Sequence, residues 1–456
     1  MTFHRKKILA LGVVMSAAAL AVTACSNNEK SSTSNPTTTT SAAASSGAAA
    51  LPKLDGQAFS VLGPWTKDEQ ATFQKVLGDF NAKTGAKGTY TSGGDDVPTI
   101  LGTKVAGGAP PDVAVLASPG AVEKFAKGGS LKPANPAVQA AVAANYGPLW
   151  TKLGSVDGKL YGVYGDASNK STVWYSTKAF QTAGISSEPK SWDEFVKASK
   201  TLADSGVKIP ISVGGGDGWT LTDWFENVYI RTAGLDNYDK LTKHQIPWTD
   251  ASVTKALTTL KQLWGDKTLI GDPATALQTS FTQSVANTFK PDASSAVVYE
   301  ASFVATQIKQ EVPNAKVGTD AKYFPFPAVD NSKPTVVGGG DAVVAFTDNP
   351  ASQAFLQYMA SPEAAKLMVS SEGSGFASAN KNLKASDYPT DVLGKVGADI
   401  VGAGDQFRFD MSDQAPSSFG GTKGQGEWKD LQAFLGNGDV AAAQAALEAD
   451  ATAAFK

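Results

Sequence analysis

The chain has 456 residues, of which 42% are hydrophobic and 18% are charged, and its formal net charge is −3 at pH 7. This length is sufficient for two globular domains, and the slightly negative charge argues against a nucleic-acid partner, which needs a basic surface. A single cysteine and two histidines exclude internal disulfides, cysteine-ligated metals and multi-histidine metal sites, and we expect neither a metal nor a cofactor.

The N-terminus has the pattern of an export signal. A basic segment (HRKK, 4–7) precedes an apolar stretch over 8–22, which is shorter than the roughly 20 residues that cross a bilayer. We therefore expect a signal peptide over 1–24. The following motif, VTAC, resembles a bacterial lipobox and implies cleavage before Cys25 and lipid attachment to its thiol. The alternative is a secretory signal whose cysteine is accidental.

Lipidation of Cys25 would hold the protein on the extracytoplasmic face of the bacterial cell membrane. The next residues are almost all Ser, Thr, Ala and Asn, as in SSTSNPTTTTSAAASSGAAA. Such a composition cannot bury enough apolar surface to offset the entropy lost on ordering. We expect 25–54 to be a disordered linker between the lipid and the folded body.

The first part of the folded body alternates strand-like and helix-like segments. The order strand, helix, strand, helix, strand is predicted over 57–63, 66–85, 88–92, 97–110 and 112–116. Apolar residues from Phe73 to Phe80 recur at helical spacing, and Gly85 is typical of a helix end. This alternation favours a parallel α/β sheet.

The second part repeats the same style. Ser191 and Glu194 form a capping-box pattern that opens a helix ending at Gly206. A strand is predicted over 207–214, and Pro362 at a first helical position starts a later helix. The fold class is therefore α/β.

Three blocks, in the same order along the chain, resemble family 1 extracellular solute-binding proteins of bacterial ABC importers, the maltodextrin-binding-protein type. They are 106–136 (AGGAPPDVAVLASPG…), 158–206 (GKLYGVYGD…WDEF…) and 336–380 (VVGGGDAVVAF…SPEAAK…). Segments 222–250 and 407–421 (FRFDMSD…) look most like those of α-glucoside and oligosaccharide binders. One departure is Tyr-Ser in place of the family's usual Tyr-Asn at 175–176.

The resemblance implies a type II periplasmic-binding-protein-like fold, with two lobes joined by crossing segments and a ligand held in the cleft between them. We expect crossings near 167–171, 297–299 and 338–341. The expected lobes are 55–167 plus 298–339 for the N-terminal lobe and 168–297 plus 340–456 for the C-terminal lobe.

A sugar site needs carboxylates and amides that bind hydroxyl groups, and aromatic rings that stack on sugar faces. Side chains that follow predicted strands or lie at the expected crossings meet this need, because ligands bind at the carboxyl ends of strands in open α/β sheets. The candidate ligand-binding residues are Trp65, Asp95, Asp96, Asp166, Lys170, Asp217, Trp219, Trp224, Glu300, Gly340, Asp341, Arg408 and Asp410.

Several candidates also have a structural alternative. A tryptophan such as Trp224 can be core packing, and the Asp95–Asp96 turn can be solvated. Glu300 can form a structural ion pair, and Arg408 can pair with Asp410 instead of a ligand.

The sequence GGGD occurs at 214–217 and again at 338–341. Neither copy matches a phosphate-binding glycine motif, and the terminal carboxylate would repel phosphate. We expect the first copy to form a sharp turn that presents Asp217 and Trp219, and the second to combine hinge and site.

These features predict a non-enzymatic, monomeric lipoprotein that captures an α-glucoside or other oligosaccharide and delivers it to the permease of an ABC importer. The alternatives are an exported glycoside hydrolase with two catalytic carboxylates, a binder of a non-sugar solute, and a sensor or adhesin on the same scaffold. A Ser-His-Asp triad would need His244, which lies in a polar segment and is expected to be solvated.

Overall fold

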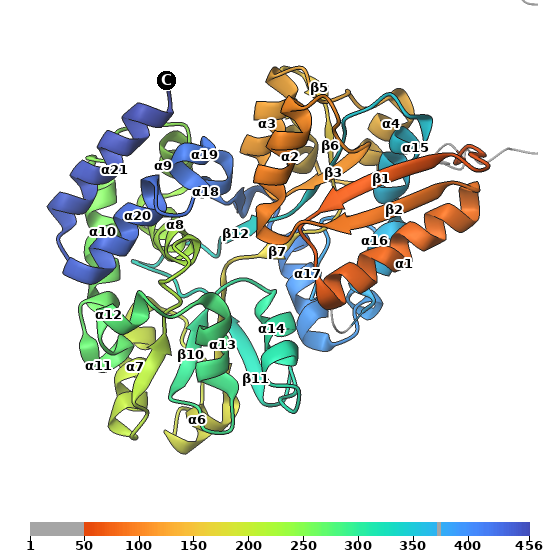
Figure 1. Cartoon of the computed structure of the whole chain (residues 1–456). Coiled ribbons are helices and arrows are strands. Elements are labelled where there is room, and N and C mark those ends of the chain that lie inside the picture. Colours follow the sequence, from red (N-terminus) through yellow and green to blue (C-terminus); the bar gives the residue numbers. More distant parts are fainter. Residues whose placement is uncertain (1–49, 372–374) are drawn as a thin grey trace, which may run out of the picture. The chain divides into compact units, whose positions relative to one another are not determined.

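The computed structural model describes residues 50–371 and 375–456 (Figure 1). The expected signal peptide, Cys25 and all of the expected linker before residue 50 lie outside these residues. Within the described ranges, none of the helices combines the length and the apolar character needed to cross a membrane.

The first large sheet has five strands, in the order β2-β1-β3-β13-β6. They are β1 (Ala58–Gly63), β2 (Lys87–Ser92), β3 (Val113–Leu116), β6 (Gly162–Tyr164) and β13 (Ala342–Ala345). β1 pairs in parallel with β2 and β3, whereas β13 is antiparallel to β3 and β6. The three strands predicted before residue 117, and the helices between them, are confirmed.

Helices from two parts of the sequence accompany this sheet. They are α1 (Lys67–Thr84), α2 (Val97–Ala106), α3 (Pro119–Lys127), α4 (Pro136–Asn145), α5 (Pro148–Leu153), α15 (Pro350–Met359) and α16 (Pro362–Val369), with the short helix η1 (Gly94–Asp96) and the hairpin β4 (Ser155–Val156) and β5 (Lys159–Leu160). In α1 the residues predicted to share one face, including Phe73 and Phe80, are buried. The helix ends where Gly85 adopts a left-handed conformation, as predicted.

The second large sheet has four strands, in the order β11-β8-β10-β9. They are β8 (Thr172–Ser176), β9 (Ile209–Ser212), β10 (Ser295–Tyr299) and β11 (Ala321–Pro325). β10 is parallel to β9, and β8 is antiparallel to both β10 and β11. The strand predicted at 207–214 is confirmed in a shorter form.

The helices of the second half come from two stretches of the chain. They are α6 (Thr177–Thr182), α7 (Trp192–Asp204), α8 (Trp219–Ala233), α9 (Leu235–Leu241), α10 (Ala251–Trp264), α11 (Lys267–Ile270), α12 (Pro273–Ala276), α13 (Phe281–Phe289), α14 (Val304–Glu311), α18 (Met411–Gln414), α19 (Ser417–Gly420), α20 (Gly426–Asn437) and α21 (Val440–Ala454). The capping box at the start of α7 is confirmed, because Ser191 and Glu194 each bond to the other's backbone N–H.

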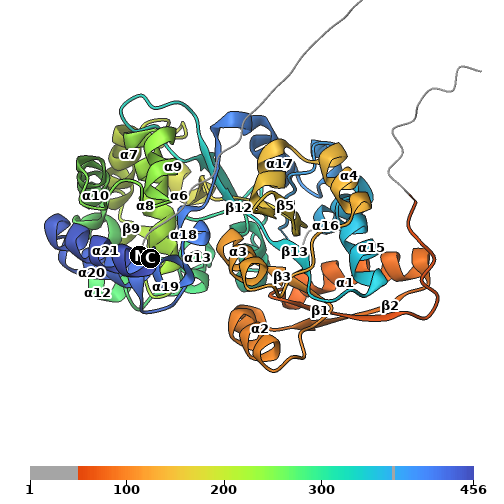
Figure 2. The same ribbon diagram turned by 90° about the horizontal axis from the view of Figure 1, so that it is seen from above.

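A third, three-stranded sheet is formed where the chain passes between these two groups of elements. Its strands are β7 (Ser168–Asn169), β12 (Val336–Gly339) and β14 (Phe407–Phe409). β12 is central, parallel to β14 and antiparallel to β7, and Figure 2 shows it between the two halves. The helix α17 (Asp391–Ala403) packs against β7 and β12, between the short helices η2 (Ala385–Asp387) and η3 (Gly404–Gln406). We call β7, β12 and β14 the crossing sheet.

Two expected crossings coincide with strands of the crossing sheet, near 168 and near 339, but the crossing expected at 297–299 is wrong. These residues belong to β10, which pairs with β8 and β9 inside the second large sheet. The third crossing is β14. An apolar strand followed by a carboxylate looks the same in sequence whether it belongs to the crossing sheet or to the second large sheet. The sequence pattern therefore could not distinguish β10 from a crossing strand.

The lobe assignment after residue 298 changes accordingly. The prediction put 298–339 in the N-terminal lobe, but β11 pairs with β8 of the second sheet. It put 340–456 in the C-terminal lobe, but β13 pairs with β3 and β6 of the first sheet. The chain remains with the second sheet through α14 and β11, and it crosses back at β12.

Glycine is present in the two GGGD stretches for different packing reasons. A Cβ at Gly338 would lie 2.5 Å from the Phe407 ring and 2.6 Å from the carbonyl oxygen of Ser168. One at Gly340 would lie 2.6 Å from the carbonyl oxygen of Asp166. Such distances leave no room for a side chain, so close approach of the crossing strands requires these glycines. Gly214 instead abuts the backbone of Phe281, at 3.0 Å from a Cβ position.

Candidate functional site

One ammonium group connects two crossings with the second lobe. The Nζ atom of Lys170 lies 2.5 Å from Oδ2 of Asp410 and 3.1 Å from Oδ1 of Asp223. It lies 3.6 Å from Oδ2 of Asp413. Lys170 follows β7, Asp223 is on α8, and Asp410 follows β14. We call these four residues the lysine cluster.

Helix α8 holds the first crossing through a row of polar residues at four-residue spacing. One turn after Asp223, Asn227 donates to the carbonyl oxygen of Lys170 at 2.9 Å and accepts from the Ser171 hydroxyl at 2.6 Å. A further turn along, Arg231 donates to Asn227 and to the carbonyl oxygen of Thr335. Residues i, i+4 and i+8 share one face of a helix, so a single face of α8 fixes both the first crossing and the approach to β12.

Charges in the lysine cluster shift one another's pKa values. Burial alone would lower the pKa of Lys170, but attraction to Asp223 and Asp410 outweighs burial and raises it well above its ordinary value. Burial would raise the pKa of Asp410, but Lys170 holds that pKa below its usual range. Burial and then the negative charge of Asp410 raise the pKa of Asp413 to about 7. The ion pair between Lys170 and Asp410 is therefore the electrostatic centre of the group.

Glu300 is buried beside this centre. Burial raises the pKa of Glu300 to about 8, against the effects of a hydrogen bond with Asp223 and attraction to Lys170. Within the described residues, Oε1 of Glu300 and Oδ2 of Asp223 are buried and receive no hydrogen bond from an N–H or hydroxyl group, so the donor between these two side chains is the carboxyl proton that they share. The structural alternative for Glu300, a simple ion pair, is not what the structure contains, since no lysine or arginine of the described part lies within ion-pair distance of it.

Three predicted residues from three strand ends do come together. The indole Nε1 of Trp65 donates to Oδ2 of Asp341 at 2.9 Å, and the backbone N–H of Asp341 donates to Oδ1 of Asp166 at 2.8 Å. Trp65 follows β1, Asp166 follows β6, and Asp341 follows β12. We call them the tryptophan–aspartate cluster. Gly340 contributes the close backbone approach described above, not a side chain.

A carboxyl group that the sequence pattern did not reveal lies near this cluster. Burial, then repulsion from Asp341, raises the pKa of Glu69 to about 7. The pKa of Asp341 is raised to about 6, chiefly by burial and against the hydrogen bond from Trp65. Glu69 lies in the first turn of α1, where an acidic residue is usual for a helix N-terminus. Because this helix-start role already accounts for the residue, nothing in the sequence indicates that Glu69 lies near Asp341.

The tryptophan–aspartate cluster and the lysine cluster are neighbours. A Cβ at Gly339 would lie 3.3 Å from Cε of Lys170 and 3.9 Å from Oδ2 of Asp413. Asp341 immediately follows Gly340 and contributes to raising the pKa of Asp413. The strand β12 thus places the tryptophan–aspartate cluster beside the lysine cluster.

Three aromatic rings meet at the starts of three helices. The centroid of Trp219 lies 5.3 Å from that of Phe281 and 5.9 Å from that of Phe303, and the two phenylalanine centroids are 5.4 Å apart. Trp219 and Phe303 are half-buried. Asp217 positions this aromatic trio, because its Oδ2 accepts from the backbone N–H of Phe281 at 2.7 Å. Asp217 was predicted to bind ligand; the structure shows this structural bond, and the ligand contact stays a prediction.

Several other predicted residues do not join these groups. Trp224 is 1% exposed and packs against Tyr299 and Phe195 in the core, so its predicted ligand contact is wrong and core packing is the correct reading. The expected pairing of Arg408 with Asp410 is wrong, because its Nε donates to Asp239 at 2.6 Å, and its ligand contact stays a prediction.

The turn expected to present Asp95 and Asp96 is the short helix η1. Asp96 is exposed and, at the N-cap of α2, forms no cap bond through its side chain, whereas the side chain of Asp95 is outside the described part. His244 is not solvated as expected. Its Nε2 lies 3.2 Å from the carboxylate of Glu448, and its side chain is 15% exposed.

A buried set of carboxylates resembles a cation site in composition. Oxygen atoms of Asp223, Glu226 and Asp410 lie within 4.8 Å of one another. Glu226 accepts from the backbone N–H groups of Met411 and Ser412, at 2.6 and 2.9 Å, at the start of α18. Lys170 pairs with the other two. The cation in this arrangement is therefore the protein's own ammonium group.

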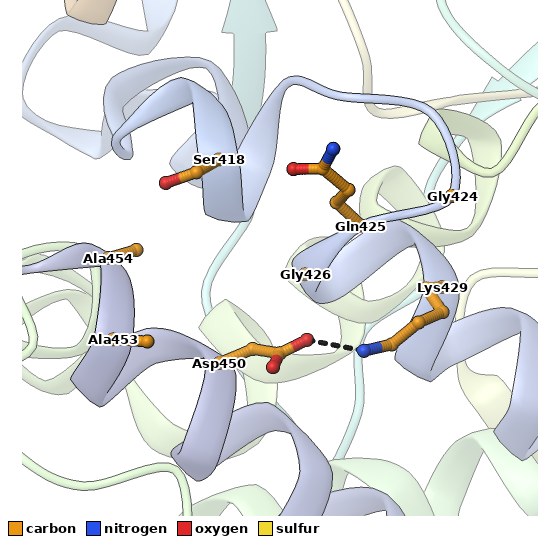
Figure 3. A pocket seen from close by; sticks show the side chains of 8 residues that line it. All are labelled: Ser418, Gly424, Gln425, Gly426, Lys429, Asp450, Ala453 and Ala454. Atoms are coloured by element: carbon orange, nitrogen blue, oxygen red, sulfur yellow. Dashed lines mark hydrogen bonds and ion pairs between the residues drawn. The ribbon is translucent and has the colours of Figure 1, made fainter.

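A separate pocket of about 330 Å³ lies among α19, α20 and α21. Figure 3 shows its lining, including the ion pair between Lys429 and Asp450 at 2.6 Å. No predicted ligand-binding residue lines this pocket. We assign no role to it.

Comparison with known proteins agrees with this architecture. The sequence model described as "Bacterial extracellular solute-binding protein" matches residues 63–366. The chain is 31% identical over 410 residues to the alpha-glucosides-binding periplasmic protein AglE of Rhizobium meliloti, covering 85% of this chain and 86% of the relative. It is 30% identical over 394 residues to the osmoprotective compounds-binding protein GgtB of Synechocystis, covering 84% and 90%.

A solved structure extends the comparison to the fold. The bacterial solute receptor AcbH, described as having a preference for β-D-galactopyranose, superimposes with a TM-score of 0.76 at 20% sequence identity. The match covers 88% of this chain and all of the other. At this identity the likeness concerns the two-lobed α/β fold alone.

Replacing Lys170 by methionine tests the lysine cluster. Lys170→Met leaves Asp223 and Asp410 buried without their counter-ion, and we expect a loss of about 3–5 kcal/mol in the free energy of unfolding. Chemical denaturation followed by tryptophan fluorescence measures the loss. The matched control is Lys255→Met, which removes an exposed pair with Asp330 and should cost less than about 1 kcal/mol. Equal losses in the two variants would contradict the role of the cluster.

Glu300→Gln tests the buried carboxyl group through pH. Because the folded-state pKa of Glu300 is about 8, above its ordinary 4.5, its protonated form stabilises the fold at low pH, and that contribution disappears as pH rises through about 8. The amide cannot lose a proton. We expect the melting temperature of Glu300→Gln to fall less than that of the parent protein between about pH 5 and pH 9. An unchanged slope, matching that of the exposed control Glu123→Gln, would exclude this shift.

Proposed function

Because the chain belongs to the family of bacterial extracellular solute-binding proteins, we propose that it captures a carbohydrate between its lobes and delivers it to an ABC importer. The observation that carries the proposal is the tryptophan–aspartate cluster, an oriented carboxylate at the ends of three strands, together with the partly exposed aromatic trio. Two of the proteins compared above point the same way, since the name of one says that it binds α-glucosides and the description of the solved structure names β-D-galactopyranose.

The chemistry of the tryptophan–aspartate cluster and of the aromatic trio suits a sugar. Oδ1 of Asp341 receives no hydrogen bond from the described residues, while Trp65 fixes the carboxylate through Oδ2. A hydroxyl of the ligand can donate to this oxygen, and such bonds to charged groups contribute about 1.5–3 kcal/mol each. Holding the carboxylate in place beforehand reduces the entropy lost on binding. Trp219 and Phe303 offer faces on which the C–H side of a sugar ring can stack.

We further propose that the lobes move about the crossing sheet. Its strands are short, two to four residues each. Because the three crossing strands pair with one another in this sheet, the lobes would rotate about a single axis located there. The first lobe would comprise about 55–165 and 342–403, and the second about 170–335 and 410–456, as the strand pairing suggests. Closure around ligand would exclude water and present a distinct form to the permease.

The remaining parts of the proposal concern the protein's setting. We propose that it binds without catalysis as a monomer and that a lipid on Cys25 anchors it outside the cell. Cys25→Ser should move the protein from the membrane fraction to the medium, measured by fractionation and immunoblotting. Retention of the serine variant in the membrane fraction would refute the anchor.

Sugar binding itself is tested by thermal shift with purified protein starting after Cys25. A panel containing maltotriose and trehalose should raise the melting temperature, since a ligand at about 100 times its dissociation constant stabilises by ~2.7 kcal/mol. The sugar recovered afterwards should be intact. Released glucose would indicate an exported glycoside hydrolase, and a shift with amino acids but with no sugar would indicate a non-sugar solute.

Site variants locate the bound sugar in the same assay. Asp341→Ala and Trp219→Ala should each weaken binding by about tenfold or more, which is the loss expected of a charged hydrogen bond or a stacked ring. Asp68→Ala, an exposed acid on α1, is the control and should leave affinity unchanged. An effect of Asp96→Ala would extend the site to η1.

A further inference from the structure

A close backbone contact joins two helices that belong to different groups of elements. A Cβ at Gly120, in the first turn of α3, would lie 2.8 Å from the carbonyl oxygen of Ala415 and 3.3 Å from that of Asp413. Ala415 directly follows α18. α3 packs on strands β3 and β13 of the first large sheet, whereas α18 packs on α8 and α19 of the second half. The contact therefore joins the two lobes outside the crossing sheet.

The second-lobe side of this contact is held in place by the lysine cluster. Asp410 binds Lys170 through Oδ2. Through Oδ1 it accepts hydrogen bonds from the backbone N–H of Asp413 and from the Ser412 hydroxyl, each at 2.7 Å. Glu226 on α8 also accepts from the backbone N–H of Ser412, at 2.9 Å. Because α18 is bonded to the second lobe at its start, its last carbonyl oxygens have a defined position.

The first turn of α3 suits these oxygens in charge as well as in shape. N–H groups in the first turn of a helix have no acceptor within the helix, and the start of a helix carries a partial positive charge. The carbonyl oxygens of Asp413 and Ala415 carry partial negative charges and face this turn at Gly120. The approach is therefore attractive, and it can be this close because residue 120 has no side chain.

We infer that Gly120 is a positioning residue for ligand capture: α3 docks on α18 when the lobes close, and the missing side chain at position 120 permits that docking. The inference rests on the proposed function, in which the lobes move about the crossing sheet. Elements of different lobes outside that sheet change their separation as the lobes move, so this close contact belongs to the closed arrangement. A side chain at position 120 would meet backbone oxygens, which cannot turn aside as a flexible side chain can, and would hold the lobes apart.

Gly120→Val tests the inference in purified protein starting after Cys25. Small-angle X-ray scattering should give the variant a larger radius of gyration than the parent protein, both without sugar and with maltotriose or trehalose, because valine excludes the arrangement described here. In calorimetry the variant should bind these sugars about tenfold or more weakly, since the apparent dissociation constant rises as the binding-competent fraction falls. Gly120→Ala adds only a Cβ and should show a smaller loss of the same kind, which also keeps the test valid if the valine variant does not fold.

Gly102 is the matched control. It lies within α2, in the same lobe, and no described residue outside its own helix comes within 4 Å of a Cβ at this position. Gly102→Ala and Gly102→Val should therefore keep the affinity and the radius of gyration of the parent protein. A lower melting temperature of Gly120→Val, with affinity and radius unchanged, would show that α3 and α18 are packed permanently and would overturn the inference.

The two proposals can fail separately. If a sugar binds Gly120→Val and the parent protein with equal affinity and the two radii agree, the closing contact is wrong and carbohydrate capture stands. If neither sugar binds the parent protein, carbohydrate capture is wrong for these sugars, and the sugar-free radii decide the closing contact. A larger radius in Gly120→Val then supports it, and an equal radius overturns it.

Discussion

The buried ammonium of Lys170 is the interaction on which the arrangement of the crossings depends. It bonds to Asp410, directly after β14, and to Asp223 on α8, and Lys170 itself directly follows β7. Two segments that are 240 residues apart in sequence therefore share one charge centre with a helix of the second lobe. A charge so buried is stable only with its partners in place, so the geometry of the two crossings and of α8 is specified together.

This centre also determines which carboxylates remain available. Lys170 pairs with Asp410 and Asp223, while among the described residues Asp341 and Asp166 on the first-lobe side receive neutral donors, the indole N–H of Trp65 and a backbone N–H. Gly338 and Gly340 allow the two sides to approach closely, because a Cβ would lie 2.5 Å from the Phe407 ring at Gly338 and 2.6 Å from the carbonyl oxygen of Asp166 at Gly340. The protein thus holds a neutralised acidic group and an unneutralised one on either side of β12. A ligand that lies between the lobes would meet the unneutralised side.

Local sequence signals predicted local structure, and they did not determine the path between lobes. The capping box at Ser191, the glycine end of α1 and the early strands are each specified by a few adjacent residues. The error at β10 and β11 arose because a buried strand has the same composition in either sheet. The error at Trp224 has a simpler cause: we expected this residue to be presented after a strand, but the segment is helical from Trp219 onward, so a residue five positions later faces the core.

Some of what was missed had a readable signal. Residues 220–231 of α8 are all buried, and a helix buried on every side cannot carry polar residues without partners. Asp223, Asn227 and Arg231 stand at i, i+4 and i+8, so they form one polar row that must meet polar groups outside the helix. The crossing segments supply those groups as the Lys170 ammonium and the carbonyl oxygens of Lys170 and Thr335. A polar row on an otherwise buried helix therefore indicates contact with irregular backbone, and in a two-lobed protein such backbone is found where the chain crosses between lobes.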